Sequence, residues 1–212
     1  MGLYVLGISA SPRKDGNSEL LLREALRGAA SAGAEAEMVA LRDLNIGPCV
    51  ECNDCYRTGR CRIEDDFQGV FNKMLKADRI IFSTPVFFMT VSAQAKLLID
   101  RFQCSWSQKY VRKKPVLDDP GRDRRAMVVA VGGSRSRKMF DGIRMVMKYF
   151  FDVLEVRWQS NLFVNKVDAR GDILQCPDAL NEAFRLGKEL ADAQGTPREK
   201  PGSVEFFCEK EQ

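Results

Sequence analysis

Short runs of apolar residues alternate along this chain with longer segments whose apolar positions recur every three or four residues. The short runs predict buried strands, and the longer segments predict helices that turn one apolar face to a core. We expect strands near residues 3–9, 35–41, 79–83, 126–131 and 157–164. We expect helices near residues 17–32, 65–76, 92–102, 138–151 and 177–193.

Five strands that alternate with five helices are typical of βα units around a parallel sheet. The pattern predicts an α/β fold, a three-layer doubly wound domain over residues 1–194. The simplest strand order under the connection rules is the flavodoxin-like 2-1-3-4-5. Residues 42–65 are expected to form a cysteine-rich loop inserted after the second strand, and residues 195–212 are expected to form a tail.

The composition of the chain argues against several classes of function. The net charge of +4 comes from basic residues interleaved with acidic ones, which is not the basic stripe of a nucleic-acid-binding protein. No apolar stretch approaches the ~20 residues that span a bilayer. The first residues run directly into a strand pattern, so we expect a cytoplasmic protein with reduced thiols. The 212 residues include no histidine, which excludes imidazole-based catalysis and metal ligation.

The turn after the first expected strand is rich in hydrogen-bond donors. It carries the side chains of Ser9, Ser11, Arg13, Asn17 and Ser18, and the next helix begins at its end. A helix N-terminus presents unpaired N–H groups and a positive dipole end, so it binds anions. The turn has neither dinucleotide-binding nor P-loop glycine spacing. It is therefore a candidate phosphate site, and an ordinary polar turn with a helix cap is the alternative.

Three segments resemble the flavodoxin-like NAD(P)H-dependent FMN reductase family. The first reads G-x-S-x-S-P-R-K-x-G-N-S over residues 7–18. The second covers residues 83–101 and contains S-A-x-x-K followed by I-D-R, with Phe87 where the family usually has tyrosine. The third is the V-G-G-S run at residues 131–134. The resemblance covers about residues 3–165 and implies an FMN cofactor, NAD(P)H as co-substrate and a homodimer or homotetramer.

The positions of these segments agree with the resemblance. Ligands of open α/β sheets bind beyond the carboxyl ends of the strands, where the loops after strands one, three and four meet. The second loop offers a wall for a flat ring, and a glycine pair in the third permits close backbone approach. The candidate ring-binding residues are Pro85, Val86, Phe87, Phe88, Met89, Gly132 and Gly133. Core aromatics beside a simple glycine turn are the alternative.

Four cysteines lie in the expected loop, at Cys49, Cys52, Cys55 and Cys61. Runs with spacings this short hold iron–sulfur clusters, and this one resembles the compact motif of the iron–sulfur flavoprotein branch of the same family. That resemblance implies a [4Fe–4S] cluster near an FMN, often that of a neighbouring subunit. Free thiols, zinc or a redox disulfide are the alternatives. The isolated Cys104, Cys176 and Cys208 are expected to be packed or free thiols.

The sequence thus predicts an FMN-dependent NAD(P)H oxidoreductase in which the cluster exchanges electrons with FMN, and the flavin rather than a side chain does the chemistry. A two-electron reductase of quinones, nitro- or azo-compounds without a cluster is the first alternative. A non-catalytic flavin electron carrier or redox sensor is the second. The electron donor or acceptor is expected to be a small molecule or a protein, without nucleic acid or membrane.

Overall fold

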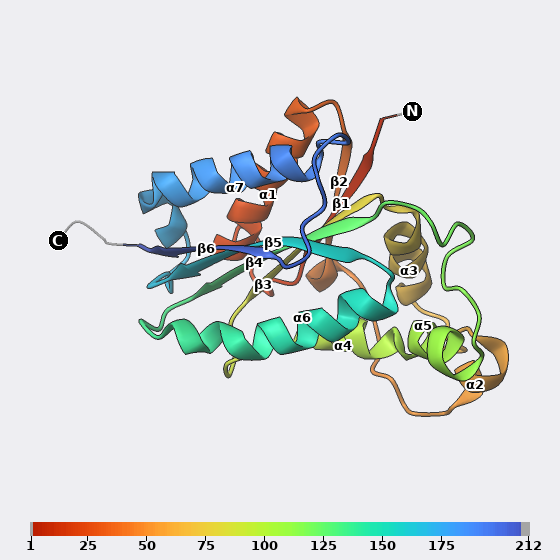
Figure 1. Ribbon diagram of the computed structural model, residues 1–212. Helices are drawn as coiled ribbons and strands as arrows, with labels where there is room; N and C mark the ends of the chain where they lie inside the picture. Colours follow the sequence, from red (N-terminus) through yellow and green to blue (C-terminus); the bar gives the residue numbers. More distant parts are fainter. Residues whose placement is uncertain (1, 209–212) are drawn as a thin grey trace.

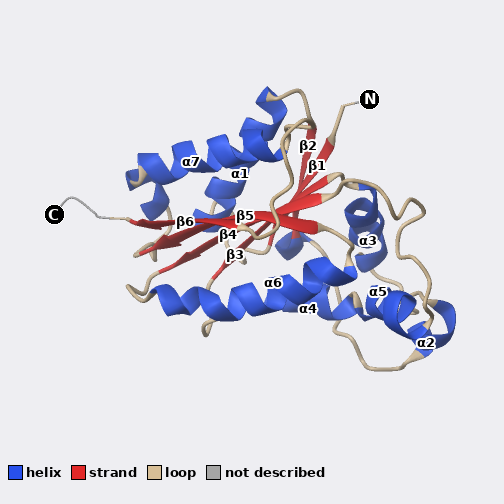
Figure 2. Ribbon diagram, in the orientation of Figure 1, coloured by secondary structure: helices blue, strands red, loops and turns tan. Residues whose placement is uncertain are grey.

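A computed structural model describes residues 2–208 of the chain, which form one parallel sheet between two layers of helices (Figures 1 and 2). The sheet has six strands in the order β2-β1-β3-β4-β5-β6, and every neighbouring pair is parallel. The strands are β1 (Tyr4–Ser9), β2 (Glu35–Ala40), β3 (Arg79–Pro85), β4 (Arg125–Gly132), β5 (Arg157–Asn165) and β6 (Gly202–Phe207). The predicted fold class and the order of the first five strands are confirmed.

Each face of the sheet is covered by helices with one apolar side. The helices are α1 (Asn17–Ser31), α2 (Asp54–Thr58), α3 (Phe67–Lys76), α4 (Ala93–Arg101), α5 (Gln103–Trp106), α6 (Asp141–Val153) and α7 (Pro177–Leu190). One core lies between the sheet and α1 and α7, and a second lies between the sheet and α3, α4 and α6. The central strand β4 is buried along its whole length, as expected for a parallel strand covered on both faces.

Helices α1 and α7 pack with their backbones unusually close. A Cβ atom placed on Gly187 would lie 1.9 Å from the carbonyl oxygen of Ala25, and one on Gly28 would lie 2.0 Å from that of Phe184. Only glycine fits at these two positions. The layer that covers the first core therefore depends on two residues that helix propensity alone would disfavour.

The segment expected to be a tail contributes a sixth strand. β6 pairs in parallel with β5, and Val204 and Phe206 pack against the core beneath α7. The next residue after the strand, Cys208, forms a disulfide with Cys176 at the start of α7, with Cα atoms 5.7 Å apart. The predictions of a tail over 195–212 and of packed or free thiols at these two cysteines are thus wrong for the described residues. Residues 209–212 lie outside the described part of the chain.

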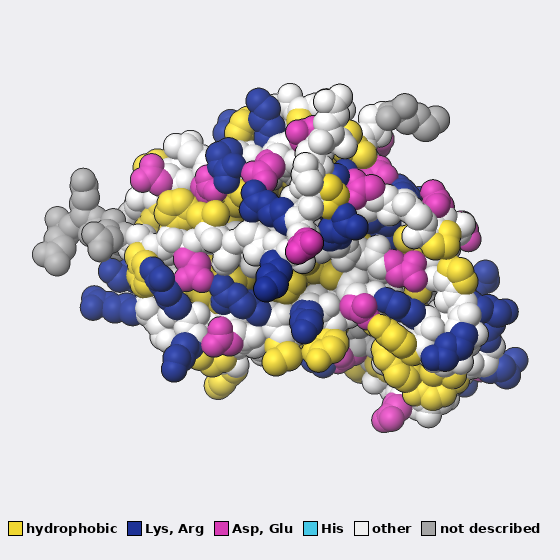
Figure 3. Space-filling model, viewed as in Figure 1, with side chains coloured by type: hydrophobic (Ala, Val, Ile, Leu, Met, Phe, Trp, Pro, Cys, Tyr) yellow, Lys and Arg dark blue, Asp and Glu magenta, His cyan; other side chains and the backbone are white. Residues whose placement is uncertain are grey.

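Two short elements lie where the sequence predicted only loops. Helix α2 forms inside the cysteine-rich segment, and a short α5 followed by a π-helical turn over Ser107–Val111 extends α4. Together they build a lobe at the end of the sheet opposite to the carboxyl ends of the strands, at the right of Figure 1. Hydrophobic side chains gather on the surface of this lobe (Figure 3), among them Tyr56, Trp106 and Tyr110. Within residues 2–208, none of the helices has the length and apolar character needed to cross a membrane.

Candidate functional site

The carboxyl ends of the central strands surround a cavity of about 90 Å³. The loops after β1, β3 and β4 line it, as the parallel topology requires. The structure brings nine of the predicted flavin-site residues to this cavity, namely Ser11, Arg13, Asn17, Ser18, Pro85, Val86, Phe87, Gly132 and Gly133. It does not bring Ser9, Phe88 or Met89 to the cavity wall.

The loop after β1 folds into a tight turn at the N-terminus of α1. The hydroxyl of Ser11 donates to the carbonyl of Arg13 at 2.9 Å and accepts from the Arg13 N–H at 3.1 Å. A Cβ on Gly16 would lie 2.5 Å from that hydroxyl oxygen, so the turn requires glycine there. The first N–H groups of a helix have no partner within it, and here Asn17 and Ser18 place that end of α1 at the cavity. The loop can thus bind an anion with backbone donors and the Arg13 guanidinium.

Besides Ser11, two predicted phosphate donors are already engaged within the protein. The buried Ser9 hydroxyl donates to Glu19 at 3.0 Å. Asn17 donates to the carbonyl of Ala169 at 2.8 Å and accepts from the N–H of Gly171 at 3.0 Å. These side chains hold the loop in shape.

Glu19 is a buried carboxylate directly behind the loop. Burial acts to raise its pKa, but hydrogen bonds from Arg42 and Ser9 and the nearby charge of Arg23 outweigh burial. The pKa of Glu19 therefore lies below its ordinary value. The ionised carboxylate joins the loop after β1 to Arg42 at the end of β2.

The segment after β3 turns sharply beside the cavity. Phe87 and Thr90 exchange backbone hydrogen bonds of 2.9 and 3.0 Å, and Phe88 and Met89 form the tip between them. Both tip residues have left-handed backbone, with φ of 47° and 64°. That region is uncommon for bulky side chains. Phe88 is fully exposed and points away from the cavity, whereas Phe87 lines it. The apolar wall predicted here consists of Pro85, Val86 and Phe87 rather than the tip.

A fourth loop that sequence reasoning missed closes the site. After β5 the chain passes over the phosphate-binding turn, and Val167, Asp168 and Arg170 line the cavity. Arg13 donates to the carbonyl of Asp168 at 3.5 Å, and Arg170 pairs with Asp15 at 3.2 Å. The sheet topology could have predicted this loop at the site, because β5 ends at the same edge of the sheet as β1, β3 and β4.

The cavity fits the phosphate end of a flavin nucleotide. Pockets that enclose a whole drug-sized ligand measure roughly 300–1,000 Å³, and about 90 Å³ accommodates only a small anionic group. A Cβ on Gly132 would approach Met139 Sδ to 2.8 Å, and one on Gly133 would approach Asp168 Cβ to 3.1 Å. Glycine at these two positions therefore keeps the packing of Met139 and Asp168 against the end of β4.

The four clustered cysteines line a second and larger cavity of about 520 Å³. Cys49, Cys52, Cys55 and Cys61 all carry free thiols. The backbone between them is tightly wound, since Glu51, Asn53 and Gly59 have left-handed φ values. The other walls are the end of α4, the buried Cys104, and the apolar face of α6 from Val146 to Val153. Burial raises the pKa of the Cys104 thiol to about 12, so this fifth sulfur is protonated at neutral pH.

A buried arginine at the end of α4 binds the cysteine segment from several sides. Arg101 Nε donates to Cys61 Sγ at 3.2 Å. Its Nη1 donates to the carbonyl of Gly47 at 3.0 Å, and its Nη2 to the carbonyl of Ile63 at 3.0 Å. Both Nη atoms reach Asp65, at 2.6 and 3.2 Å, and the guanidinium lies over the ring of Phe67. Arg57, which lies among these cysteines in sequence, is not the cation at the thiols, because it is exposed and pairs with Asp54.

The donor set fits a polynuclear cluster, since four free thiols without a disulfide line one cavity. Over residues 2–208, the side chains do not gather any three or more His, Cys, Asp or Glu groups around a single metal-ion position. The four thiols thus share one cavity, and in the described residues they do not form a closed single-ion site.

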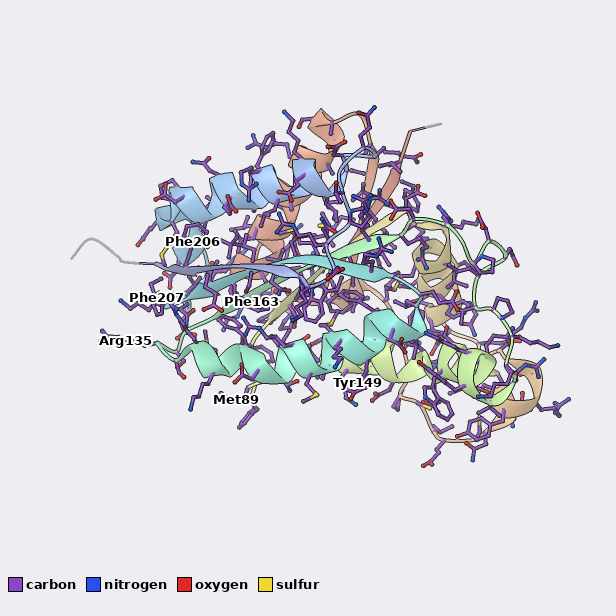
Figure 4. All side chains as sticks on the ribbon, in the orientation of Figure 1. Met89, Arg135, Tyr149, Phe163, Phe206 and Phe207 are labelled. Atoms are coloured by element: carbon purple, nitrogen blue, oxygen red, sulfur yellow. A yellow bond between two sulfur atoms is a disulfide. The ribbon has the colours of Figure 1, made fainter. Side chains whose placement is uncertain are left out.

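The two cavities lie at opposite ends of α4 and α6. α6 begins near the flavin end, where a Cβ on Gly142 would lie 2.2 Å from the Met89 carbonyl oxygen, and ends with Phe150 and Val153 at the cysteine cavity. Figure 4 places Met89 and Tyr149 toward these two ends. The 13 residues of α6 span about 20 Å at 1.5 Å per residue. Within one chain, the cysteine cavity at the end of α6 thus lies about a helix length from the start of α6.

Several known proteins resemble this chain in sequence or in fold. The family model described as NADPH-dependent FMN reductase matches residues 3–141. An iron–sulfur flavoprotein of Methanocaldococcus jannaschii is 40% identical over 199 residues, covering 90% of this chain and 96% of that protein. An iron–sulfur flavoprotein of Archaeoglobus fulgidus is 32% identical over 146 residues, covering 69% of this chain and 70% of that protein. Among solved structures, an NAD(P)H:quinone oxidoreductase from Methanothermobacter marburgensis superposes with a TM-score of 0.65 at 17% identity, covering 90% of this chain and 98% of that one.

Proposed function

Because the chain belongs to the NADPH-dependent FMN reductase family, we propose that it is an FMN-dependent NAD(P)H oxidoreductase of the iron–sulfur flavoprotein kind. In this proposal Cys49, Cys52, Cys55 and Cys61 hold a [4Fe–4S] cluster, and electrons pass between that cluster and FMN. The observation that carries the proposal is the lining of one cavity by these four free thiols, in a chain with a separate cavity that suits a flavin phosphate.

At the flavin end, the residues of the chain bind and orient. The N-terminus of α1 and Arg13 supply positive potential for a phosphate. Gly132 and Gly133 line the cavity at the end of β4, and Phe87 supplies apolar contact. Bound FMN would supply the hydride and electron chemistry. No ionisable side chain among those lining this cavity is needed as a general acid or base.

At the cysteine end, the chain would supply four thiolate ligands, with the apolar face of α6 as one wall. The cysteine cavity is open enough to be reached from outside, and the exposed Tyr56 and Trp106 stand at its wall. A bound cluster would supply one-electron transfer. Because the cysteine cavity lies about 20 Å along α6 from the start of that helix, we propose that the cysteine segment of one chain serves the flavin site of a second copy. The protein would then work as a homodimer or homotetramer.

The proposal is tested by purification without air, followed by iron, sulfide and FMN analysis and visible spectroscopy. We expect four irons and one FMN per chain, with broad absorbance that bleaches on reduction by dithionite. NAD(P)H oxidation is then followed with several acceptors. Flavin bands with no iron would contradict the cluster and leave a two-electron FMN reductase.

Paired variants separate the two cofactors. Cys49→Ser and Cys61→Ser should lose iron and keep FMN, whereas Cys104→Ser, which removes a neighbouring buried thiol, should keep both. Arg13→Ala should lose FMN and keep iron, and its neighbour Lys14→Ala is the matched control because Lys14 does not line the cavity. Full retention of FMN by Arg13→Ala would contradict the assigned phosphate site.

A further inference from the structure

The buried Arg101 donates a hydrogen bond to a cysteine sulfur, a contact that the fold itself does not require. The side chain of Arg101 has no solvent exposure, yet its Nε–H is directed at Cys61 Sγ rather than at a backbone carbonyl. Two other buried arginines, Arg79 and Arg124, show the usual arrangement. Arg79 donates to the carbonyls of Leu190 and Asp123 and pairs with the Asp123 carboxylate. Arg124 donates only to backbone carbonyls.

The remaining hydrogen bonds of Arg101 fix its guanidinium in place. Asp65 binds both Nη atoms, and it also accepts the N–H groups of Gly47 at 2.9 Å and Phe67 at 3.0 Å. Arg101 and Asp65 thus connect both ends of the cysteine segment, before Cys49 and after Cys61. A planar guanidinium can make these fork-like contacts and still donate through Nε.

We propose that Arg101 is a positioning residue for the cluster: it holds Cys61 in the cavity and raises the reduction potential of the cluster through its charge and its hydrogen bond to that sulfur. This inference rests on the proposed function and assigns a role to a residue that is not itself a ligand.

The sign of the effect follows from charge. Reduction adds one negative charge to a cluster that already carries four thiolates. A buried cation and an N–H donated to a ligand sulfur stabilise the more negative state more strongly, and hydrogen bonds and net charge are known determinants of such potentials. The carboxylate of Asp65 offsets part of the cation's charge. Removing Arg101 should therefore lower the potential, and neutralising Asp65 should raise it.

The test compares three variants after anaerobic reconstitution with iron and sulfide. Arg101→Gln removes the cation, Asp65→Asn removes its partner's charge, and Arg79→Gln removes an equally buried arginine away from the thiols. Iron and FMN per chain are measured first, and the midpoint potential is then titrated with mediators. For Arg101→Gln we expect at least a tenfold fall in the equilibrium constant for one-electron reduction, which corresponds to about 59 mV. The midpoint potential of Asp65→Asn should shift in the opposite direction, and that of Arg79→Gln should equal the wild-type value.

Potential shifts of opposite sign in Arg101→Gln and Asp65→Asn distinguish this role from a general loosening of the structure. Such loosening would shift the potential of both variants in the same direction. A wild-type potential and full iron in Arg101→Gln would overturn the inference. Loss of iron from Arg101→Gln with FMN retained would support the holding role. If Arg101→Gln fails to fold, the midpoint potentials of Arg101→Lys and Asp65→Asn are compared with that of the wild type instead. Wild-type potentials in both variants would overturn the inference. Absence of iron from the wild-type protein would instead refute the proposed function.

Discussion

The disulfide between Cys176 and Cys208 allows a quantitative prediction about stability. The perturbation is Cys208→Ser, which cuts the link between the start of α7 and the end of β6. The two cysteines are 32 residues apart, and closing a loop of that length in the unfolded chain is worth about 3.7 kcal/mol at 25 °C by the chain-entropy relation. We therefore expect the free energy of unfolding to fall by roughly 3–4 kcal/mol, a large part of the total for an ordinary domain.

The assay is urea denaturation of iron-free protein with and without a reducing agent. The wild-type midpoint should fall on reduction, whereas the midpoint of Cys208→Ser should not respond. Cys176→Ser and the double variant should match Cys208→Ser, because each breaks the same bond. Thiol counting in denaturant should give five groups before reduction and seven after it. Seven thiols before reduction, or an unchanged wild-type midpoint, would refute the reasoning.

Three further predictions concern packing, pH and the phosphate-binding turn. Gly187→Ala should destabilise the protein by about 1–3 kcal/mol in urea denaturation, because its Cβ would meet the Ala25 carbonyl oxygen. Its control Gly69→Ala, a helical site with open space, should instead stabilise by up to about 1 kcal/mol. The lowered pKa of Glu19 implies stabilisation that is complete above its ordinary value of 4.5 and is lost as pH falls through the folded-state pKa. The stability difference between wild type and Glu19→Gln should therefore shrink in acid, and a constant difference would contradict this. Gly16→Ala should release FMN in a gel-filtration assay without loss of iron, since a Cβ there collides with the turn.

The parallel sheet was predictable because β1, β3 and β4 are continuous apolar runs between helical patterns. β6 was not, because it is a short edge strand whose sequence alternates apolar and polar residues after a segment rich in proline, glycine and charge. Its core contacts through Val204 and Phe206 exist only once α7 is in place. The disulfide was missed for a related reason, since sequence spacing does not show that two lone cysteines lie at one edge of a sheet.

The candidate site also has a part that could be predicted from the sequence and a part that could not. The phosphate-binding turn is local, so Ser11, Arg13 and the N-terminus of α1 could be identified from adjacent residues. Ser9 and Asn17 have the right chemistry for phosphate binding, but long-range partners occupy them, and Asn17 binds a loop more than 150 residues away. Sequence patterns report which donors exist, while only the fold reports which donors are already used.

The segment over residues 83–101 shows how one sequence motif can contribute to two sites. Its first part forms the wall of the flavin cavity. Ser92 then donates to the Ala10 carbonyl at 2.7 Å and caps α4 by accepting the N–H of Ala95 at 3.2 Å, which anchors this helix to the end of β1. Nine residues later the helix ends at Arg101, against Cys61. A motif that resembles a flavin signature is therefore also the structural connection to the cysteine cavity. A change at either end of α4 is expected to affect the geometry of the other end through one short, well-packed helix.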